Sequence, residues 1–396
     1  MRKRSWVRWL APVWLALSAA AVHADPRDIT IGYVSTVRER LDPVSPLDVR
    51  ASDEGLQGAR LGIADNATTG RFTGQDFRLE ERIIEKDGDA VATLEGLAAA
   101  GIRFVVADLD AADLVKAAAS PPGRSLVLLS VRATDDALRG ARCSANVLHV
   151  APSRAMLADA LAQYLVWKRW KRWFLVVGPA PEDRLYADAV RRAAARFGAD
   201  IVVEKPWAFR QGSGRADTGH VTLQAEVPAF TNVADHDVLV VADEGGAFGD
   251  YLEGRTARPR PVAGTHGLVA TSWSPVAEQW GATQLQHRFV KQAGRRMGAL
   301  DYAAWAAVRS VGEAAIRTRS GDPATIAGYL RGPEFALSAF KGQGQTFRTW
   351  DGQMRQPILI AGPRLLVSVS PQPGFLHRSS ELDTLGVDRE ESACRL

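Results

Sequence analysis

The hydrophobic positions of the chain fall into short runs that alternate with longer amphipathic segments. The runs are rich in β-branched residues, whereas the segments between them are rich in alanine and carry apolar residues at helical spacing. In the first part of the chain the expected strands cover 29–34, 77–84, 102–106 and 126–129, and the expected helices cover 54–66, 89–100 and 110–118. Strands that alternate with helices in this way predict βαβ units and a largely parallel sheet.

The same alternation restarts after residue 149. Ser153 is suited to cap a helix at its N-terminus. The apolar positions of that helix follow the spacing i, i+4, i+7, i+8 and are Leu157, Leu161, Tyr164 and Leu165. Further strands are expected at 173–177, 201–203, 238–241 and 261–264, and a further helix at 182–197. The expected fold class is therefore α/β, with two doubly wound parallel-sheet lobes.

Past residue 265 the pattern becomes mainly helical. Helices are expected at 275–297, 302–318 and 323–330, and strands at 345–348 and 356–360. The turn signal Trp350-Asp351-Gly352 lies between these two strands and indicates that they form a hairpin. The final segment, 371–396, contains proline, serine and many charges, so it is expected to be a loosely packed tail unless Cys394 attaches it to the fold.

The N-terminal segment 1–24 has the features of a cleaved secretory signal peptide. Four cations precede an apolar run that ends in the small-residue pattern Val22-His23-Ala24, which predicts cleavage after Ala24 and export of the mature chain. No later run approaches the roughly 18 consecutive apolar residues at which a membrane-spanning helix is expected. The remaining roughly 372 residues exceed the usual size of a single core and predict two domains.

Removal of that segment changes the charge balance. The whole chain has 49 Lys and Arg against 45 Asp and Glu, a formal net charge of +4. Segment 1–24 holds four of these cations and no acid, so the mature chain has 45 residues of each sign and is neutral. Nucleic acid is not an expected partner, because its binding depends on a basic excess. The basic run WKRWKRW at 167–173 is then either a structural turn or a docking patch for a protein partner.

The chain has two cysteines, Cys143 and Cys394. An oxidising compartment makes a disulfide between them possible, and two unpaired thiols are the alternative. A bridge would close a loop of about 250 residues, for which chain entropy gives a stabilisation on the order of 5 kcal/mol. The sequence has no CxxC, HExxH or Cys/His cluster that would suggest a structural metal.

Nine segments, taken together in their order and spacing, resemble the type I periplasmic binding proteins, the family of the leucine/isoleucine/valine receptors of ABC importers. They are ITIGYV at 29–34, GARLGIADN at 58–66, GIRFVVADLDAADL at 101–114, LVLLSVRATDDALRG at 126–140, HVAPSRAMLADALAQYL at 149–165, PEDRLYADAVRRAAARFGADIVVE at 181–204, DVLVVADEGG at 237–246, PVAGTHGL at 261–268 and DYAAWAAVRSVGEAAI at 301–316. The runs RATDDALRG, APSRAMLADALAQYL and WKRWKRWFLVVG, together with Trp273, Trp280 and the segment 284–286, resemble a sub-branch associated with PQQ-dependent alcohol dehydrogenase systems.

The resemblance implies the type I periplasmic binding protein fold and, together with the expected signal peptide, a periplasmic location. Two lobes are then joined by three chain crossings, and the ligand lies in the cleft at the carboxyl ends of the strands. By the same resemblance the first lobe comprises 25–146 plus 268–335, the second lobe comprises 147–265 plus 340–370, and 371–396 is a C-terminal tail.

In this family the loop after the third strand holds the carboxylate of an amino-acid ligand at a helix N-terminus. The matching positions here include Asp108 and Asp110, whose charges would repel a carboxylate, so a free amino acid is not the expected ligand. For Asp110 a helix N-cap role is the alternative, and the two roles are compatible.

The segment after the fourth strand also binds the ligand in this family. Ser130 and Thr134 match its hydroxyl residues, with turn capping as the alternative role. Arg132 departs from the family pattern and can pair with Asp108 or Asp110.

The second lobe contributes four further candidates. Tyr186 matches the aromatic residue that walls the ligand in the family, with a partly buried helix tyrosine as the alternative. Asp243 and Glu244 follow an expected strand and are directed to the cleft or are surface acids. The acid that pairs with a ligand ammonium falls on or next to His266, and a neutral imidazole cannot replace that charge.

These positions favour a solute-binding protein over an enzyme. The sequence has no nucleophile elbow, Walker motif, dinucleotide fingerprint or SxxK set, and no cofactor is expected. The expected ligand is cationic, metal-bound, or neutral and hydroxylated, for example an alcohol or a related oxidised metabolite. An ABC permease of the inner membrane is the expected transient partner. The alternative is an accessory or sensor protein that acts on a periplasmic dehydrogenase or a kinase without transport.

Overall fold

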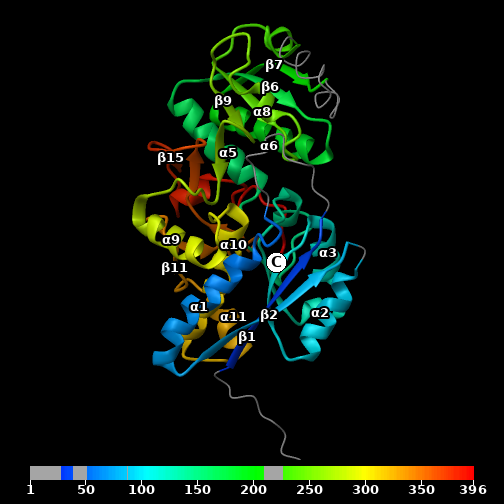
Figure 1. Cartoon of the computed structure of the whole chain (residues 1–396), viewed down its shortest axis with the longest axis vertical. Helices are drawn as coiled ribbons and strands as arrows, with labels where there is room; N and C mark the ends of the chain where they lie inside the picture. Colours follow the sequence, from blue (N-terminus) through cyan, green and yellow to red (C-terminus); the bar gives the residue numbers. More distant parts are fainter. Residues whose placement is uncertain (1–27, 39–50, 87, 209–225) are drawn as a thin grey trace, which may run out of the picture.

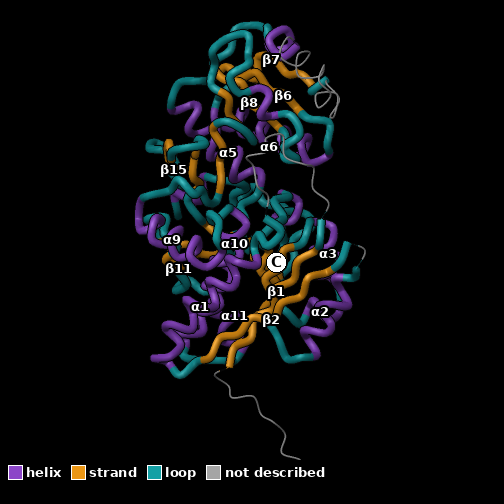
Figure 2. The backbone as a smooth tube through the Cα atoms, in the orientation of Figure 1, coloured by secondary structure: helices purple, strands orange, loops and turns teal. Residues whose placement is uncertain are grey.

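The computed structural model describes residues 28–38, 51–86, 88–208 and 226–396. Two α/β lobes lie one above the other along the long axis of the molecule (Figure 1), and each lobe has its own sheet (Figure 2). The expected signal peptide lies outside the described residues. Within the described ranges, no helix has the length and apolar character that a membrane span requires.

The first sheet has five parallel strands in the order β2-β1-β3-β4-β5. Its strands are β1 (Asp28–Thr36), β2 (Asp76–Ile84), β3 (Phe104–Asp108), β4 (Val127–Ser130) and β5 (Val147–His149). The helices of this lobe are α1 (Leu56–Thr73), α2 (Ala90–Ala99), α3 (Ala111–Ala119), α4 (Pro121–Arg124), α9 (Ala282–Ala293), α10 (Ala299–Thr318) and α11 (Pro323–Arg331). The expected parallel sheet is confirmed, and the three-residue strand β5 is an addition to it.

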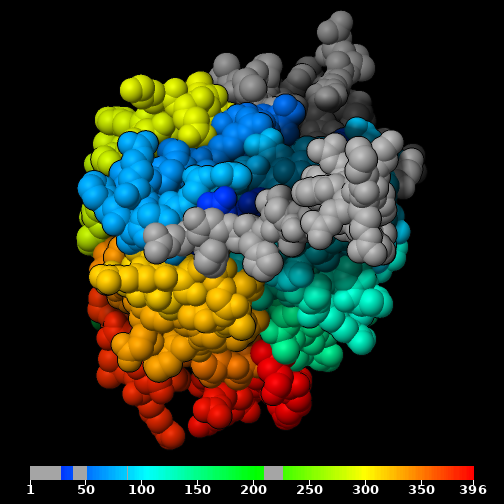
Figure 3. Space-filling view, turned by 90° about the horizontal axis from the view of Figure 1, so that it is seen from below, coloured from blue at the N-terminus to red at the C-terminus, as the bar shows by residue number. Residues whose placement is uncertain are grey.

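Close packing of α1 against α10 joins the two parts of the first lobe, which are far apart in sequence. The blue residues of the first part and the yellow to orange residues of the second lie side by side in Figure 3. A Cβ at Gly58 would lie 1.9 Å from the Asp301 carbonyl oxygen, and a Cβ at Gly312 would lie 2.1 Å from Asn66. Glycine at these positions therefore allows the two helices to approach.

The second sheet has seven strands in the order β15-β14-β10-β9-β8-β6-β7. Its strands are β6 (Arg172–Val177), β7 (Asp200–Pro206), β8 (Val238–Ala242), β9 (Val262–Gly264), β10 (Leu268–Thr271), β14 (Ile358–Ala361) and β15 (Leu366–Ser370), and the lobe includes the helices α5 (Arg154–Trp167), α6 (Pro181–Phe197) and α8 (Gly249–Leu252). β10 pairs with β9 and β14, so the chain leaves the second sheet after Thr271 rather than at residue 268. The five strands from β7 to β10 are parallel, as the pattern predicts.

The hairpin expected between 345–348 and 356–360 is wrong. β12 (Gly344–Phe347) pairs with the two-residue strand β13 (Met354–Arg355), and together with β11 (Leu337–Ser338) they form a small third sheet. The turn at Trp350-Asp351-Gly352 closes this shorter hairpin. The next strand, β14, then enters the second sheet, where it pairs with β10 and β15, so 345–348 and 356–360 belong to different sheets.

The basic run at 167–173 forms the turn between α5 and β6. Trp173 is buried and its indole N–H donates to the Trp170 carbonyl at 2.8 Å, and Arg169 adopts a left-handed φ of 64°. Trp167 is half-exposed, and the Lys168 ammonium lies 5.2 Å from the centre of its ring. The structural-turn role is confirmed, and the docking role stays a prediction.

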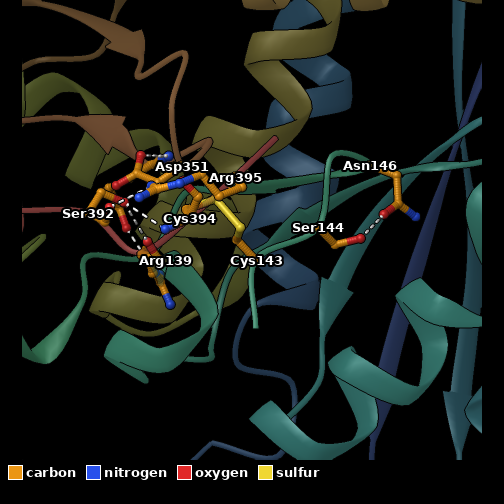
Figure 4. Close-up of a disulfide and its surroundings, with 9 residues drawn as sticks. Arg139, Cys143, Ser144, Asn146, Asp351, Ser392, Cys394 and Arg395 are labelled. Carbon is orange, nitrogen blue, oxygen red and sulfur yellow. Dashed lines mark hydrogen bonds between the residues drawn. A yellow bond between two sulfur atoms is a disulfide. The ribbon is translucent and has the colours of Figure 1, made fainter. Parts of the chain in front are cut away.

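The final segment is packed rather than loose. Cys394 and Cys143 form a disulfide with a Cα–Cα distance of 5.7 Å (Figure 4). Leu382 and Leu385, in and after the short helix η3 (Glu381–Thr384), are buried. The sequence predicted a loosely packed tail unless Cys394 attaches it to the fold, and the disulfide provides this attachment.

Candidate functional site

A cavity of about 740 Å³ lies between the two lobes, where the carboxyl ends of strands from both sheets meet. From the first lobe its lining residues are Arg38, Glu54, Arg132 and Thr134. From the second lobe they are Leu157, Tyr186, Asp243, Glu244, Gly245, Gly246, Gly264, Thr265, His266, Val269 and Ala270. A cleft at this position is the usual ligand site of open α/β sheets.

A buried network around Asp108 forms the base of the first-lobe wall. One carboxylate oxygen accepts hydrogen bonds from the Tyr33 hydroxyl at 3.0 Å, from the Ser35 hydroxyl at 2.8 Å and from Arg132 Nη2 at 3.2 Å. The other oxygen accepts from Arg132 Nε. Burial, and then the charge of Asp108, raises the pKa of Tyr33, so this phenol stays protonated and donates. Asp108 lines an adjoining pocket of about 380 Å³ rather than the main cavity.

Arg132 lies between these two hollows and lines both of them. Its side chain is a quarter exposed, whereas that of Asp108 is 1% exposed. Burial lowers and Asp108 raises the pKa of Arg132, with a net upward shift, so the guanidinium remains charged. Its Nη1 group has no hydrogen-bond partner among the described residues. The pairing of Arg132 with Asp108 was one of two alternatives in the sequence, and the structure selects it.

Asp110 and Ser130 lie outside the linings of both hollows. The Asp110 carboxylate accepts from the Asp113 amide at 2.9 Å and caps α3, so the N-cap role is confirmed. Ser130 is buried at the end of β4, and its carbonyl accepts from the amides of Val150 and Ala151 at 2.8 and 3.2 Å. Thr134, from the same segment as Ser130, does line the main cavity. Ligand contact by Asp110 or Ser130 stays a prediction.

Asp243 is directed away from solvent, into a turn of its own lobe. Its carboxylate accepts from the amides of Ala247, Phe248 and Gly249 at 2.9, 2.8 and 2.7 Å. Hydrogen bonds from backbone N–H groups stabilise the charged form of a carboxylate. Asp243 therefore fixes the loop that follows β8 rather than presenting an open charge to the cavity.

Glu244 pairs with an arginine that also reaches the first lobe. Arg154, the first residue of α5, donates from Nε and Nη2 to the Glu244 carboxylate at 2.9 and 2.7 Å, and its Nη1 lies 3.2 Å from the Asp135 carboxylate. Burial raises the pKa of Glu244, and Arg154 opposes this shift. Arg154 was not among the candidates from the sequence. A cation directly after the N-cap of an apolar helix is unusual, and this could have indicated that Arg154 pairs with an acid.

Tyr186 and His266 form the polar part of the second-lobe wall. Tyr186 is 3% exposed, burial raises its pKa, and its hydroxyl makes no hydrogen bond within the described ranges. The His266 ring lies 3.0 Å from the Thr265 hydroxyl through Nδ1, and its Nε2 lies 3.9 Å from the Asp243 carboxylate and 3.8 Å from that of Asp250. A neutral phenol and an imidazole can together donate to or accept from a ligand hydroxyl.

Of the eight candidates, five line the main cavity: Thr134, Tyr186, Asp243, Glu244 and His266. The structure adds Arg38, which donates to the Asp108 carbonyl at 3.2 Å and lines both hollows. Its place just after β1 gave no chemical signal in the sequence. No group of three or more His, Cys, Asp or Glu side chains in the described residues has the geometry to hold a metal ion.

No protein-family model matches the chain, and no curated protein matches it. Several solved structures are similar to the chain. A branched-chain amino acid ABC transporter periplasmic ligand-binding protein from Burkholderia xenovorans is 16% identical with a TM-score of 0.68, over 86% of this chain and 95% of that one. An ABC transporter substrate-binding protein from Desulfitobacterium hafniense, in complex with Leu, is 18% identical with a TM-score of 0.63, over 86% and 99%.

A third similar structure is a solute-binding protein of an ABC transporter from R. palustris in complex with benzoate. It is 12% identical with a TM-score of 0.61, over 93% of this chain and 99% of that one. These likenesses extend over almost the whole length of each known protein. The chain therefore has the fold of the type I periplasmic binding proteins, as the resemblance implied.

Proposed function

We propose that this chain is a periplasmic solute-binding protein of an ABC import system, and that it holds a small ligand in the cavity between its lobes. The position of the cavity and the fold shared with solved solute receptors support this role. The expected signal peptide would deliver the chain to the periplasm. An inner-membrane ABC permease would be its transient partner, and the role is binding and delivery rather than catalysis.

The ligand class that the cavity supports best is a small organic acid. One observation carries this: the guanidinium of Arg132 lines the cavity with an unpartnered Nη1 group, while Asp108 holds its other edge. A planar guanidinium fixed from behind is suited to a carboxylate, because the fork of donors loses little freedom when it binds. The Thr134 hydroxyl, in the same wall, adds a donor.

This proposal replaces the cationic ligand that the acids of the sequence favoured. The carboxylates of Asp108, Asp243 and Glu244 are already satisfied, by Arg132, by three backbone amides and by Arg154 respectively. A cation entering the cavity would have to displace these partners. An entering carboxylate would meet Arg132 without displacing any of them, and this weakens the electrostatic objection to an anion.

The opposite wall favours a ligand that carries a second oxygen. The hydroxyl of Tyr186 and the ring of His266 lie in the second lobe, across the cavity from Arg132. Both can hydrogen-bond to a hydroxyl or keto group, and Leu157 and Val269 offer apolar contact. We therefore propose a hydroxy, keto or aromatic acid with a short carbon skeleton rather than a free amino acid.

Such a ligand would be consistent with a link to PQQ-dependent alcohol oxidation, because acids are the end products of alcohol oxidation. The link rests on the resemblance of the WKRWKRWFLVVG and RATDDALRG segments to the corresponding sub-branch. A periplasmic dehydrogenase would then be a functional partner. The half-exposed Trp167, with Lys168 over its ring, is the surface we propose for such a contact.

A thermal-unfolding screen with matched ligand sets tests the ligand class. Each set contains an alcohol, its aldehyde and its acid with the same carbon skeleton, for example benzyl alcohol, benzaldehyde and benzoate, and leucine is the amino-acid comparison. We expect only acids to raise the unfolding temperature, since a ligand at 100 times its Kd adds about 2.7 kcal/mol. Stabilisation by the alcohol or by leucine without the acid, or by no member of the panel, contradicts the proposal.

A further inference from the structure

The segment after β15, residues 371–396, contacts both lobes, and we refer to it as the C-terminal strap. It begins at the edge of the second sheet, passes the junction of the lobes and ends at the first lobe in the disulfide of Cys394 with Cys143. Figure 4 shows this end, where Ser392 and Cys394 lie beside Arg139 and Cys143. No strap residue lines the cavity between the lobes.

Two helices of the second lobe hold the middle of the strap. The buried Asp159 of α5 accepts from the Gly386 amide at 2.8 Å, and the Gly386 carbonyl accepts from Arg192 and Arg196 of α6 at 2.9 and 2.6 Å. Gln163 of α5 accepts from the Gln372 amide at 3.0 Å. These bonds place strap backbone against polar side chains in an otherwise apolar helix, and so fix the strap to the second lobe.

The small third sheet, which packs on the core of the first lobe, holds the same stretch from the other side. Asp383 of the strap accepts from Arg348 Nε and Arg355 Nε, both at 2.8 Å, and the side chains of Asp383 and Arg348 are each 1% exposed. Arg348 Nη2 also donates to the Leu385 carbonyl at 2.8 Å. Breaking a buried pair of this kind is strongly destabilising, because the remaining charge stays buried.

The last residues of the strap then bond covalently to the first lobe. Cys143 lies in the loop before β5, and the nearby Ser392 hydroxyl reaches the Arg139 carbonyl at 3.5 Å. Eight peptide steps separate Gly386 from Cys394 and could span at most about 29 Å if extended. Contacts shorten the path, since Glu391 lies 3.4 Å from Arg192 and accepts from the Asp388 amide at 3.3 Å.

We propose that the C-terminal strap is a fourth connection between the lobes and limits how far they separate. The three crossings permit a hinge motion that opens the cavity. Opening would move α5 and α6 away from Cys143 and the third sheet, which the strap holds together through Asp383 and the disulfide. The strap thereby sets the open state from outside the cavity, without touching ligand. This inference rests on the hinge motion of the proposed function, and its test needs no ligand.

Energy transfer between two labels, one on each lobe, measures the separation directly. Phe72 of α1 is 89% exposed and Leu185 of α6 is 45% exposed, so a keto-bearing amino acid at each site accepts fluorophores without using thiols. We compare the labelled parent chain with the double variant Cys143→Ser, Cys394→Ser, and with Asp383→Asn, which keeps the disulfide. We expect both variants to shift the distribution to longer and broader separations.

A matched control separates opening from a general loss of stability. Val308→Ala removes buried methyl groups from α10, which makes no hydrogen bond or ion pair with the strap in the described part of the chain. It should lower the unfolding temperature while leaving the distance distribution unchanged. If the double variant does not fold, reduction and alkylation of the folded parent supplies the same comparison. Distributions identical to that of the parent chain, with only a lower unfolding temperature, would overturn the strap proposal and leave the proposed ligand binding unaffected.

Discussion

The change Asp108→Asn tests the buried network that positions Arg132. One carboxylate oxygen accepts from Tyr33, Ser35 and Arg132, and the other accepts from Arg132 as well. An amide has one oxygen and one NH2 group, so either orientation places a donor against a donor. The variant also removes the charge that compensates the Arg132 guanidinium.

The expected loss can be worked from these contacts. Removing one partner of a buried ion pair costs about 3–5 kcal/mol, and a hydrogen bond to a charged group contributes about 1.5–3 kcal/mol. Arg132 is a quarter exposed, so water can hydrate part of the unpaired guanidinium and reduce the penalty. We expect Asp108→Asn to lower the free energy of unfolding by about 2–4 kcal/mol.

Urea unfolding of the parent chain, Asp108→Asn and Asp110→Asn measures this loss. Asp110 is two residues away but is exposed and caps α3, and asparagine caps a helix as well as aspartate does. The control should therefore stay within about 0.5 kcal/mol of the parent chain. Equal losses in the two variants would refute the view that Asp108 is committed to the buried network.

Two further changes test the packing. Burial holds the pKa of Lys341 well below its usual 10.5, so the folded chain binds fewer protons than the unfolded chain and stability rises with pH up to that value. Lys341→Met removes the titrating group and should flatten this rise, as urea midpoints between pH 7 and about 10 would show. Gly312→Ala would place a Cβ 2.1 Å from Asn66 and should cost about 1–3 kcal/mol, whereas Gly96→Ala on the open face of α2 should add about 0.5–1 kcal/mol. A stable Gly312→Ala chain would contradict the close helix contact.

The order of strands and helices could be predicted because it depends on local patterns. Apolar runs such as 173–177 and 238–241 are buried on both faces of a parallel sheet, and this leaves a clear signature in the sequence. The short elements β5 and β13 have too few residues for any period to be visible. The hairpin expected between 345–348 and 356–360 was wrong because β13 could not be recognised. A turn signal indicates that the chain reverses, but it does not show which strand pairs after the reversal.

The burial of the polar residues of α5 could not be predicted from local sequence patterns. Asp159 and Gln163 are fully buried in a helix whose apolar positions suggested one buried face. Burial raises the pKa of Asp159 to about 6, and Arg192 and Arg196 oppose the shift. Their partners, Gly386 and Gln372, lie more than 200 residues later in the chain, so no local pattern could supply them.

The position of the candidate site could be predicted from the sequence, but the pairing of its charged side chains could not. Counting acids after the strands indicated a region that repels anions, because a sequence does not show which carboxylates are already satisfied. Asp243 accepts three backbone amides that exist only once the turn after β8 has formed. Arg132, noted as a departure from the family pattern, lines the cavity and is the residue that we propose as the anchor of an acid.

Calorimetric titration of the best-stabilising acid into the parent chain, Arg132→Gln and Arg60→Gln tests the central proposal most directly. Arg60 is an exposed arginine of α1 that pairs with Glu81, so its variant controls for the loss of a cation on the same lobe. We predict binding at one site in the parent chain and in Arg60→Gln, and a loss of affinity of about tenfold to 100-fold in Arg132→Gln, as expected for one charge-assisted contact. Equal affinities in all three chains would contradict the assignment of Arg132 as the carboxylate anchor of the cleft.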